Sequence, residues 1–419
     1  MPIRIAGAGC CLMDILYPRV DFHSPVFESA RSLMDGDGGL APGRLVFAED
    51  AERFLAARDA RLGLPAQSLP DLMAAIAGGS PPEIENVGGP SVVALIHAAQ
   101  MLEGTGADVE FAGARGEDEL GDRLLARLQQ IPIGLDAYRR GAGRTPSTIV
   151  LSDPTWDGGR GERCFINEIG AAAGFLPAEL GPPFLGADIV AFGGTALVPP
   201  LHDGLPELLQ AARARGALTV VNTVFDFRNE RRDPRGAWPL GPAASTLGGG
   251  PGPAASYENC ELLVMDRDET LRLSGEATLE GAQAFFARSG VGAFVITRGG
   301  ESVIVWSGGR RFAAVGPLEL PVSALALREL AVQAAAGKRQ GDTTGCGDAF
   351  AGGLIASVAS QLAKGMKKLD LAEAVGWAIA GGAATLFILG GTYREERPGQ
   401  KLAAVERFHH DWLRQIGRA

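Results

Sequence analysis

The sequence predicts an α/β fold with a mostly parallel central sheet and helices on both of its faces. From residue 187 onward, apolar strand-like runs alternate with longer helical runs, which is the order of parallel βαβ units. The first apolar run, residues 3–12, is typical of a buried strand. The chain of 419 residues can bury a substantial core, although composition does not decide between one large domain and two smaller ones.

Composition and charge restrict the classes of partner. The formal net charge is −10 and the pI is near 5.2, and no run of Lys and Arg offers the basic surface that nucleic-acid phosphates require. The five cysteines are odd in number and lack the CxxC spacing of a zinc or redox site. Residues 1–15 contain no cleavable apolar leader. We therefore expect a cytoplasmic protein that does not bind nucleic acid.

One uncharged stretch, residues 374–393, is long enough to be compared with a membrane span. It contains two Gly-Gly pairs, has only moderate hydrophobicity and is the single stretch of its kind. These features favour a helix buried within the protein, and we expect no membrane partner.

Asp14 follows the first predicted strand. Ligands of open α/β sheets bind at the carboxyl ends of the strands, so Asp14 is a candidate binding residue, although a single Asp after a strand is more often a cap or turn residue. The nearby GAGCC segment is only a partial dinucleotide motif, because Leu12 replaces its third Gly. We reject a dinucleotide-binding fold on this ground.

Residues 20–86 form an insertion that is richer in Gly, Pro and charge than its surroundings. We predict two helices in it, at residues 48–61 and 69–77. The sequence leaves open whether the insertion decorates the surface or contacts the ligand cleft. After it, Gly88 and Gly89 precede an apolar helix whose first residue, Pro90, suits that position.

A β-hairpin is predicted where two β-rich runs, residues 147–151 and 163–167, bracket a turn rich in Pro, Gly and Asp. Arg163, Asn167 and Glu168 are the hairpin residues that could face a ligand, although solvated side chains are the commoner case in hairpins.

A second insertion, residues 316–340, contains a helical run just before residue 341. The simplest interpretation of this run is a helix that packs against the core. Alternatively, the helix covers a nucleotide base or makes a regulatory contact.

The string GDTTGCGDAFAGG, residues 341–353, carries the strongest chemical signal. Gly345, Cys346 and Gly347 crowd small residues into a turn before an apolar run, so their N–H groups can open a helix and face an anion. Asp348 then lies in the first helical turn, where the dipole stabilises a carboxylate. An anion beside a carboxylate suggests phosphoryl transfer. If the pattern Gly-x-Gly-Asp stood alone, a purely structural Gly-rich turn capped by the Asp would be the better interpretation.

The full string DTTGCGDAF resembles the C-terminal signature of the PfkB family of sugar and nucleoside kinases, the ribokinase-like fold. The resemblance implies one kinase domain over residues 1–419. It also implies a small β-sheet lid, with elements at about residues 14–25 and 144–170, that closes over the substrate and allows a homodimer contact.

Roles at the signature follow from the same resemblance. Asp348 corresponds to the base that takes the proton from the substrate hydroxyl. The amides of Gly345, Cys346 and Gly347 correspond to those that stabilise the transferred phosphoryl group, with Cys346 where Ala is usual. Thr344 is assigned to the nucleotide site.

The resemblance extends to the substrate side. In the family, an Asp in the context of Asp14 hydrogen-bonds substrate hydroxyls, and the substrate rests on a Gly-Gly turn that Gly88 and Gly89 match. The Asn that often follows these glycines is absent here, with Val92 and Val93 in that region, so the contact that it makes elsewhere is in doubt.

The MDRDET segment resembles the family's Asn-x-x-Glu motif, in which the Glu orders the metal around the triphosphate. Glu269 is therefore assigned to Mg²⁺, and Asp266 stands where Asn is usual; an acidic helix cap is the alternative. Thr297 and Gly299 match a Thr-x-Gly turn beside the ATP phosphates. The resemblance also allows a monovalent cation such as K⁺.

These observations predict an ATP-dependent kinase that acts on a hydroxyl group of a small sugar or sugar derivative. The sequence contains no GxxxxGK[ST] motif, which excludes a P-loop kinase. Three alternatives stay open: a nucleoside kinase of the adenosine kinase type, a non-catalytic member that binds nucleotide for regulation, and a cysteine enzyme that uses Cys346 at a helix N-terminus.

Overall fold

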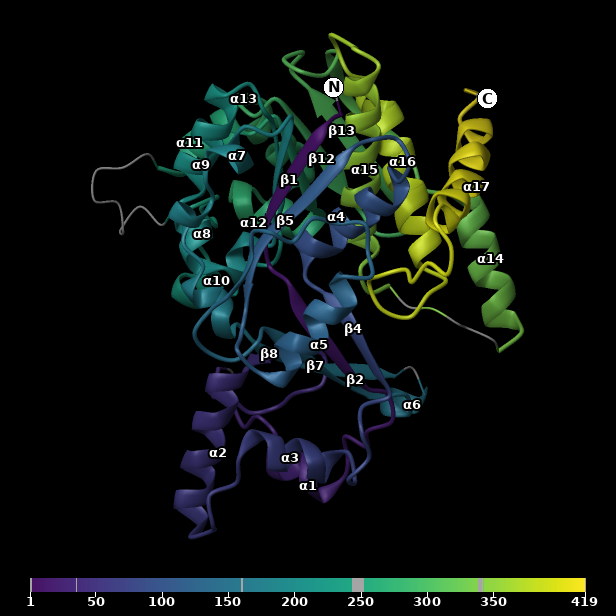
Figure 1. Ribbon diagram of the computed structural model, residues 1–419. Helices are drawn as coiled ribbons and strands as arrows, with labels where there is room; N and C mark the ends of the chain where they lie inside the picture. The colour runs from purple at the N-terminus through teal and green to yellow at the C-terminus, as the bar shows by residue number, and fades with distance from the viewer. Residues whose placement is uncertain are drawn as a thin grey trace.

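Two β-sheets organise the computed structural model, which describes residues 2–34, 36–159, 161–242, 252–337, 341 and 343–418. The central sheet has the strand order β14 (Val315–Pro321), β13 (Ser302–Ser307), β12 (Ala293–Thr297), β11 (Leu262–Asp266), β10 (Leu218–Asn222), β9 (Ile189–Gly193), β1 (Arg4–Gly9), β5 (Asp108–Arg115) and β6 (Tyr138–Arg140). The second sheet, named the lid sheet here, has the order β3 (Leu45–Phe47), β8 (Glu162–Glu168), β7 (Ser147–Asp153), β2 (Leu12–Tyr17) and β4 (Ile84–Gly88). Figure 1 shows the lid sheet below the central sheet.

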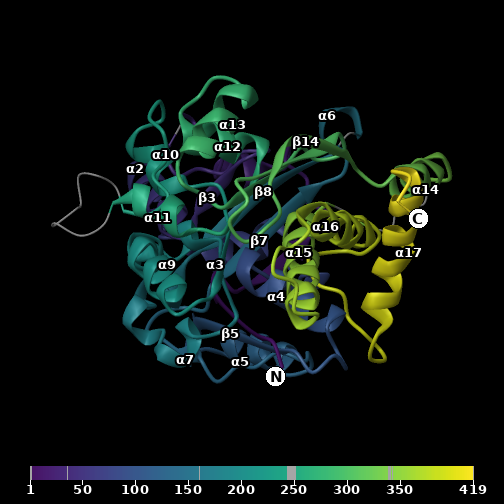
Figure 2. The same cartoon turned by 90° about the horizontal axis from the view of Figure 1, so that it is seen from above.

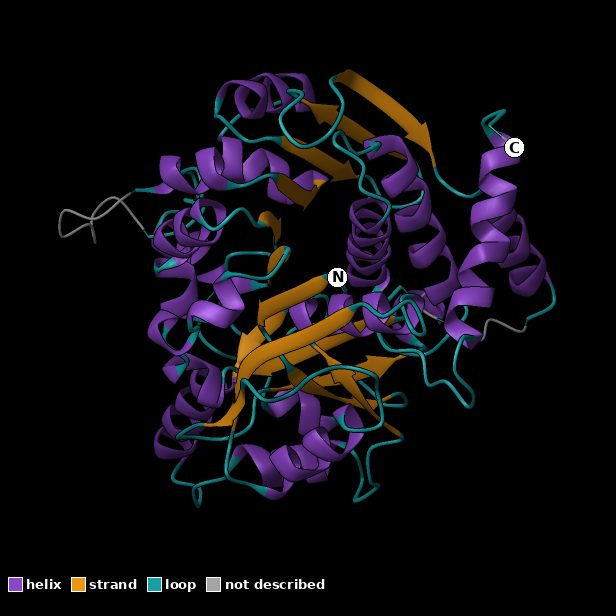
Figure 3. Ribbon diagram, turned by 45° about the horizontal axis from the view of Figure 1, so that its top comes forward, coloured by secondary structure: helices purple, strands orange, loops and turns teal. Residues whose placement is uncertain are grey.

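The central sheet is parallel from β12 to β6, and β13 and β14 join it antiparallel at one edge. Two apolar cores fill its two faces, because neighbouring residues of a strand such as Ile5 and Ala6 point to opposite sides. The predicted α/β fold with a mostly parallel sheet is confirmed. Figures 2 and 3 show the helices that cover both faces.

The helices form two layers. One core contains residues of α4 (Pro90–Met101), α5 (Glu119–Leu128), α15 (Cys346–Ala363), α16 (Leu371–Thr385) and α17 (Gln400–Gln415), with α14 (Ala324–Ala335) against it. The other contains residues of α7 (Pro182–Leu185), α8 (Pro199–Asp203), α9 (Leu205–Ala214), α11 (Pro253–Asn259), α12 (Arg267–Ser274) and α13 (Leu279–Arg288). The remaining short elements are α6 (Trp156–Gly159), α10 (Phe227–Arg232) and 3₁₀ helices at Gly170–Gly174, Pro177–Glu179 and Thr195–Leu197.

The uncharged stretch at residues 374–393 includes most of α16, which is a buried helix as predicted. A side chain at Gly381 would lie 2.7 Å from the Ala349 carbonyl oxygen, so this Gly allows α16 to pack closely on α15. None of the helices in the described ranges combines the length and apolar character that a bilayer crossing needs.

The first insertion forms both a cover and two strands of the lid sheet. Its helices are α1 (Pro25–Ser29), α2 (Ala48–Leu62) and α3 (Leu69–Ile76), so both predicted helices are present. They bury one face of the lid sheet in a third core that includes Val46, Leu151 and Ile166. The insertion also supplies β3 and β4, because their strand-like segments pair with β8 and β2. The predicted hairpin is present as β7 and β8, which run antiparallel.

The first strand does not follow the predicted path. We expected one strand over residues 3–12 that delivers Asp14 at its end. Instead β1 ends at Gly9, the chain bends, and Asp14 lies inside β2 of the lid sheet. Gly9 permits this bend because it has φ 149° and lies directly against the Gly193 carbonyl, where no side chain fits. Residues 338–340 of the second insertion and Asp342 of the signature string lie outside the described residues.

Candidate active site

The Gly-rich turn of the signature string opens helix α15. Gly345 is its N-cap with a left-handed conformation (φ 72°), and a side chain there would collide with the backbone of Gly391. A methyl group built on Gly347 would meet no described atom within 4 Å, so Gly347 faces open space. The first amides of a helix have no intrahelical acceptor. Within the turn, the Cys346 N–H donates to the Thr343 carbonyl at 3.3 Å. The turn, residues 345–347, which we call the amide cradle, has further N–H groups at the helix start that an anion entering this space can meet.

Asp348 lies in the first turn of α15, directly after Gly347. Its side chain is half-buried, and burial raises the pKa of its carboxyl group to about 6. A carboxylate with a pKa near neutrality suits the role of a proton acceptor at physiological pH. The predicted base and the amide cradle therefore share one helix end.

Glu269 lies at the start of α12 and forms a capping box with Asp266. The Glu269 N–H donates to Asp266 Oδ1 at 2.8 Å, and the Asp266 N–H donates to Glu269 Oε2 at 3.0 Å. The Thr223 hydroxyl donates to the same Oε2 at 2.6 Å. Burial and then the Asp266 charge raise the pKa of Glu269 to about 7, and the Asp348 charge adds to this rise. Glu269 and Asp348 are thus within electrostatic reach of each other.

This arrangement suits a metal held mainly by nucleotide phosphates. In the described part of the chain, no three His, Cys, Asp or Glu side chains gather closely enough to hold a metal by themselves. Mg²⁺ in kinase sites usually takes one or two carboxylates, with phosphates and water as its other ligands. Both hydrogen bonds to the Glu269 carboxylate use Oε2, which leaves Oε1 suited to a direct or water-mediated contact with Mg²⁺.

Thr297 and Gly299 line a cavity of about 420 Å³ together with the amide cradle. Thr297 ends β12, and Gly299 turns the chain towards β13 with φ 59°. Much of the remaining wall is apolar and comes from α14, α16 and the C-cap of α16: Ala326, Leu327, Leu330, Ile379, Ala383 and Leu386. The second insertion therefore forms a wall of this cavity.

Thr344 lies where the lid sheet meets the amide cradle. Its hydroxyl accepts a hydrogen bond at 3.4 Å from Nη1 of Arg163, which belongs to β8. Arg163 is one of the hairpin residues that the sequence left open. The structure therefore joins the hairpin directly to the signature turn.

Asp14, Gly88 and Gly89 come together where β2 meets β4. A methyl group built on Gly88 would lie 2.6 Å from Asp14 Cγ, so the Asp14 carboxylate fills the space in front of this Gly. Gly89 has φ 105°, and a side chain there would lie 2.6 Å from the Cys10 carbonyl oxygen. The three predicted substrate residues thus form one compact group.

The Cys10 thiol is influenced by both Asp14 and Asp348. Burial is the main cause that raises the pKa of this thiol, and the charges of Asp14 and Asp348 are among the smaller causes. A charge raises a neighbour's pKa only when the two groups lie close together. The Asp14 carboxylate of the lid sheet and the Asp348 carboxylate of α15 are therefore both within electrostatic reach of Cys10.

A row of side chains crosses the inner face of the lid sheet. Strand register pairs Asp14 with Asn86 on one side and with Thr148 on the other; Thr148 pairs with Asn167, and Asn167 pairs with Phe47. Residues paired in this way point to the same face of a sheet. The alternate residues pack under the insertion helices or α5. We call this set the lid row: Asn86, Asp14, Thr148, Asn167 and Phe47.

The Asn86 end of the lid row contacts the loop beside the amide cradle. Asn86 Nδ2 donates to the Leu389 carbonyl at 3.4 Å, and Asn86 Oδ1 accepts a hydrogen bond from the Thr392 hydroxyl. The same loop contains Gly391, which lies against Gly345. The lid row therefore begins beside the amide cradle.

Comparison with known protein families shows the family to which the chain belongs. The model of the pfkB family carbohydrate kinases matches residues 94–394, more than half of the chain. The chain belongs to the PfkB family. The matched range includes Glu269, Thr297 and Asp348, whereas Asp14 and Gly88 precede it. No curated protein sequence matches the chain.

Solved structures agree with the PfkB fold. Adenosine kinase from Sinorhizobium meliloti has 17% identity and a TM-score of 0.65, covering 97% of this chain and 99% of its own. Adenosine kinase from Schistosoma mansoni, in complex with 2-fluoroadenosine, has 14% identity and a TM-score of 0.63, covering 93% and 97%. Ribokinase from Arabidopsis thaliana, complexed with ribose and ATP, has 14% identity and a TM-score of 0.58, covering 98% and 99%. At these identities the likeness concerns the fold.

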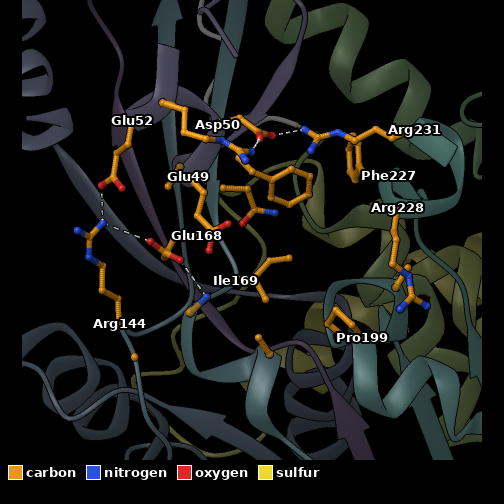
Figure 4. A pocket seen from close by; sticks show the side chains of 18 residues that line it. Glu49, Asp50, Glu52, Arg144, Glu168, Ile169, Pro199, Phe227, Arg228 and Arg231 are labelled. Carbon is orange, nitrogen blue, oxygen red and sulfur yellow. Dashed lines mark hydrogen bonds and ion pairs between the residues drawn. The ribbon is translucent and has the colours of Figure 1, made fainter. Parts of the chain in front are cut away.

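The PfkB chain also has a cavity at the other end of the lid row, which the sequence did not reveal. It has a volume of about 620 Å³ and lies between the lid sheet, α2 and α10 (Figure 4). Phe47 and Asn167 of the lid row line it, together with Phe227 of α10. We call it the lid cavity. The first insertion therefore lines a cavity on the inner side of the lid sheet, in addition to covering the outer face of that sheet.

Proposed function

We propose that this PfkB-family protein is an ATP-dependent kinase that transfers the γ-phosphoryl group to a hydroxyl group of a small sugar or sugar derivative. The observation that carries this proposal is the position of Asp348, with a pKa of about 6, beside the open amide cradle at Gly347. Phosphoryl transfer needs a base on the attacking hydroxyl, donors for the developing charge, charge neutralisation and exclusion of water. Each need has a candidate in this site.

On the acceptor side, the Asp14 carboxylate would hold a substrate hydroxyl, and Gly88 and Gly89 would shape this subsite by leaving room for that carboxylate and for the Cys10 carbonyl. Asp348 would accept the proton of the attacking hydroxyl while the oxygen of that hydroxyl forms a bond to the γ-phosphorus of ATP. The bond between that phosphorus and the bridging oxygen breaks, and ADP leaves. The amides of residues 345–347 would stabilise the charge on the transferred group.

On the donor side, the cavity lined by Thr297, Gly299 and α14 would hold the nucleotide, with its base against the apolar wall. Glu269 would hold Mg²⁺, which when bound neutralises phosphate charge. Thr344 would lie at the phosphates. Its contact with Arg163 of the lid sheet supports a lid that closes over this end and keeps water out.

Three further expectations belong to this proposal. The five cysteines all lie among the described residues and none of them forms a disulfide bond, which suits the reducing cytoplasm. A monovalent cation such as K⁺ is an added requirement that the kinase assay can test directly. A homodimer through the lid would use the insertion helices, because these helices cover the outer face of the lid sheet.

The experiment that tests the proposal is acceptor-dependent release of ADP. The purified protein is incubated with MgATP and a panel of sugars and nucleosides, and ADP and phosphorylated acceptor are measured together. We expect one ADP per phosphorylated acceptor for at least one compound. ATP binding without ADP release for any acceptor would support the non-catalytic alternative instead. Loss of all activity in Cys346→Ala, with ATP affinity unchanged, would support the cysteine enzyme.

A further inference from the structure

We propose that the acceptor is a nucleoside, with its hydroxylated ring at Asp14 and its neutral planar base in the lid cavity against Phe47 and Phe227. This inference rests on the proposed kinase activity and chooses among its acceptors: it favours the nucleoside alternative over a free sugar. The observations behind it are the length of the lid row, the aromatic wall of the lid cavity and the pairing of the charges around it.

The lid row is longer than one sugar ring. Neighbouring strands lie about 4.8 Å apart, so Asn167 is about 10 Å and Phe47 about 14 Å from Asp14 across the sheet. A free monosaccharide held by Asp14 would leave the far end of the row unused. A ring that carries a second group would reach Asn167 and the lid cavity behind it.

The far end of the row is aromatic. The rings of Phe47 and Phe227 meet edge to face, with their centroids 5.6 Å apart, and both are half-buried in the wall of the lid cavity. The Arg231 guanidinium lies over the Phe47 ring at 4.8 Å from its centroid. Such a wall favours a flat apolar surface. The volume of about 620 Å³ is within the range of about 300–1,000 Å³ that is usual for small-molecule sites.

Polar groups at the same place can read the edge of a base. The Asn167 side chain is buried and its Oδ1 accepts a hydrogen bond from the Thr148 hydroxyl at 3.4 Å. An amide that is fixed in this way can donate through its NH₂ group to a heteroatom of the ligand. A purely apolar substituent would leave this group without a partner, so the planar group is expected to carry acceptors.

The arginines around the lid cavity are already paired with carboxylates. Arg144 contacts Glu52 at 2.9 Å and Glu168 at 3.4 Å, and Arg231 contacts Asp50 at 2.5 Å, as Figure 4 shows. Arg53 also pairs with Asp50, and Arg228 pairs with Asp203 at 2.9 Å. Each arginine of the wall thus has a carboxylate partner. A phosphate or carboxylate on the substituent would have to break these pairs, so a neutral substituent fits better.

The experiment measures binding, so that it does not depend on turnover. Isothermal calorimetry compares adenosine, inosine and uridine with D-ribose and ribose 5-phosphate, each in the presence of Mg²⁺ and a non-hydrolysable ATP analogue. We expect at least one nucleoside to bind 10-fold or more tightly than D-ribose and ribose 5-phosphate. Equal or tighter binding of D-ribose or of the phosphosugar would overturn the inference.

Two variants locate the base. Phe47→Ala and Phe227→Ala should each weaken nucleoside binding by about 10- to 100-fold, the range expected when an aromatic ring that stacks on a base is removed. Affinity for D-ribose should change less than about 2-fold in both. Phe54→Ala is the matched control, because Phe54 lies on the same insertion helix but packs in the core under the lid sheet.

The outcomes separate this inference from the proposed function. If nucleosides bind and the two variants weaken them while no acceptor is phosphorylated, the substrate class stands and the kinase proposal fails. If sugars are phosphorylated and the Phe47→Ala and Phe227→Ala proteins bind nucleosides as the Phe54→Ala protein does, the kinase proposal stands and the nucleoside inference is wrong.

Discussion

The Asp14 carboxylate occupies the space in front of Gly88, so that a methyl group at position 88 would lie only 2.6 Å from Asp14 Cγ. Asp14 belongs to β2 and Gly88 to β4, and both strands lie in the lid sheet. Position 88 therefore requires a glycine because the Asp14 side chain leaves no room for another residue, and not because of the backbone conformation of Gly88.

Gly88→Ala should displace the Asp14 carboxylate without unfolding the protein. We expect a loss of about 100-fold in kcat/KM for the acceptor, since a shift of about 1 Å in a positioning group can have this effect. The KM for ATP should stay unchanged. Gly316→Ala, where a methyl group meets no described atom within 4 Å, is the control. Steady-state kinetics of the two variants test this prediction. An unchanged kcat/KM for the acceptor in Gly88→Ala would show that Asp14 is not part of the acceptor site.

The pH dependence of kcat should report Asp348. Burial raises the pKa of this carboxyl group to about 6, and a base must be unprotonated to accept a proton. The rate at saturating substrates should therefore fall as the pH falls through about 6, and be level above about pH 7. Initial rates between about pH 5 and pH 9 test this, with activity re-measured at pH 8 after exposure to low pH. A rate that stays level down to pH 5 would contradict the assignment.

Glu269→Gln separates the metal role of Glu269 from its capping role. Gln retains the capping box with Asp266 and can still accept a hydrogen bond from Thr223, so the free energy of unfolding should change by less than about 1 kcal/mol. The Mg²⁺ concentration for half-maximal rate should rise about 10-fold or more. Glu269→Ala should lose the cap as well, which costs about 1 kcal/mol. Mg²⁺ titration of the rate and chemical denaturation measure both effects. An unchanged Mg²⁺ requirement in Glu269→Gln would leave Glu269 as a cap alone.

Lys401 is a buried ammonium group whose substitution should stabilise the protein. Its side chain is 1% exposed, its Nζ lies 3.4 Å from the Thr385 hydroxyl, and burial lowers its pKa to about 7. The unfolded chain binds a proton up to about pH 10.4, so between about pH 7 and pH 10 the unfolded state holds more protons and stability rises with pH. Below about pH 7 the lysine is protonated in both states, so the full free-energy cost of burying its ammonium group is present.

Lys401→Met should therefore raise the free energy of unfolding at pH 6 by about 4 to 5 kcal/mol, and the gain should shrink towards pH 10. Denaturation at the two pH values tests this, with the exposed Lys367→Met as control. A gain that is equal at both pH values would show that packing rather than charge is responsible.

Much of the geometry of the candidate site could be predicted because it is local in the sequence. The residues that make the amide cradle and Asp348 follow one another, and the spacing of Asp266 and Glu269 is that of a helix cap. Such patterns depend on the backbone conformation within one helical turn, so they can be recognised without knowledge of the rest of the fold.

The lid row could not be predicted in this way. It brings together Asn86, Asp14, Thr148, Asn167 and Phe47, which are joined only by strand register. Phe47 directly precedes a helix, where an apolar residue is common for local reasons, and nothing near it in the sequence points to a cavity. Lys401 is similar, because a lysine on a helix is usually exposed and its burial depends on residues of other segments, such as Thr385.

Phosphoryl transfer with Asp348 as base is tested most directly by the Asp348→Asn variant. ATP affinity is measured by calorimetry, and phosphorylated acceptor is measured by mass spectrometry beside the unchanged protein. We predict an ATP affinity within about 2-fold of the unchanged protein and a kcat lower by about 10²- to 10⁴-fold. Turnover in Asp348→Asn equal to that of the unchanged protein would contradict the account.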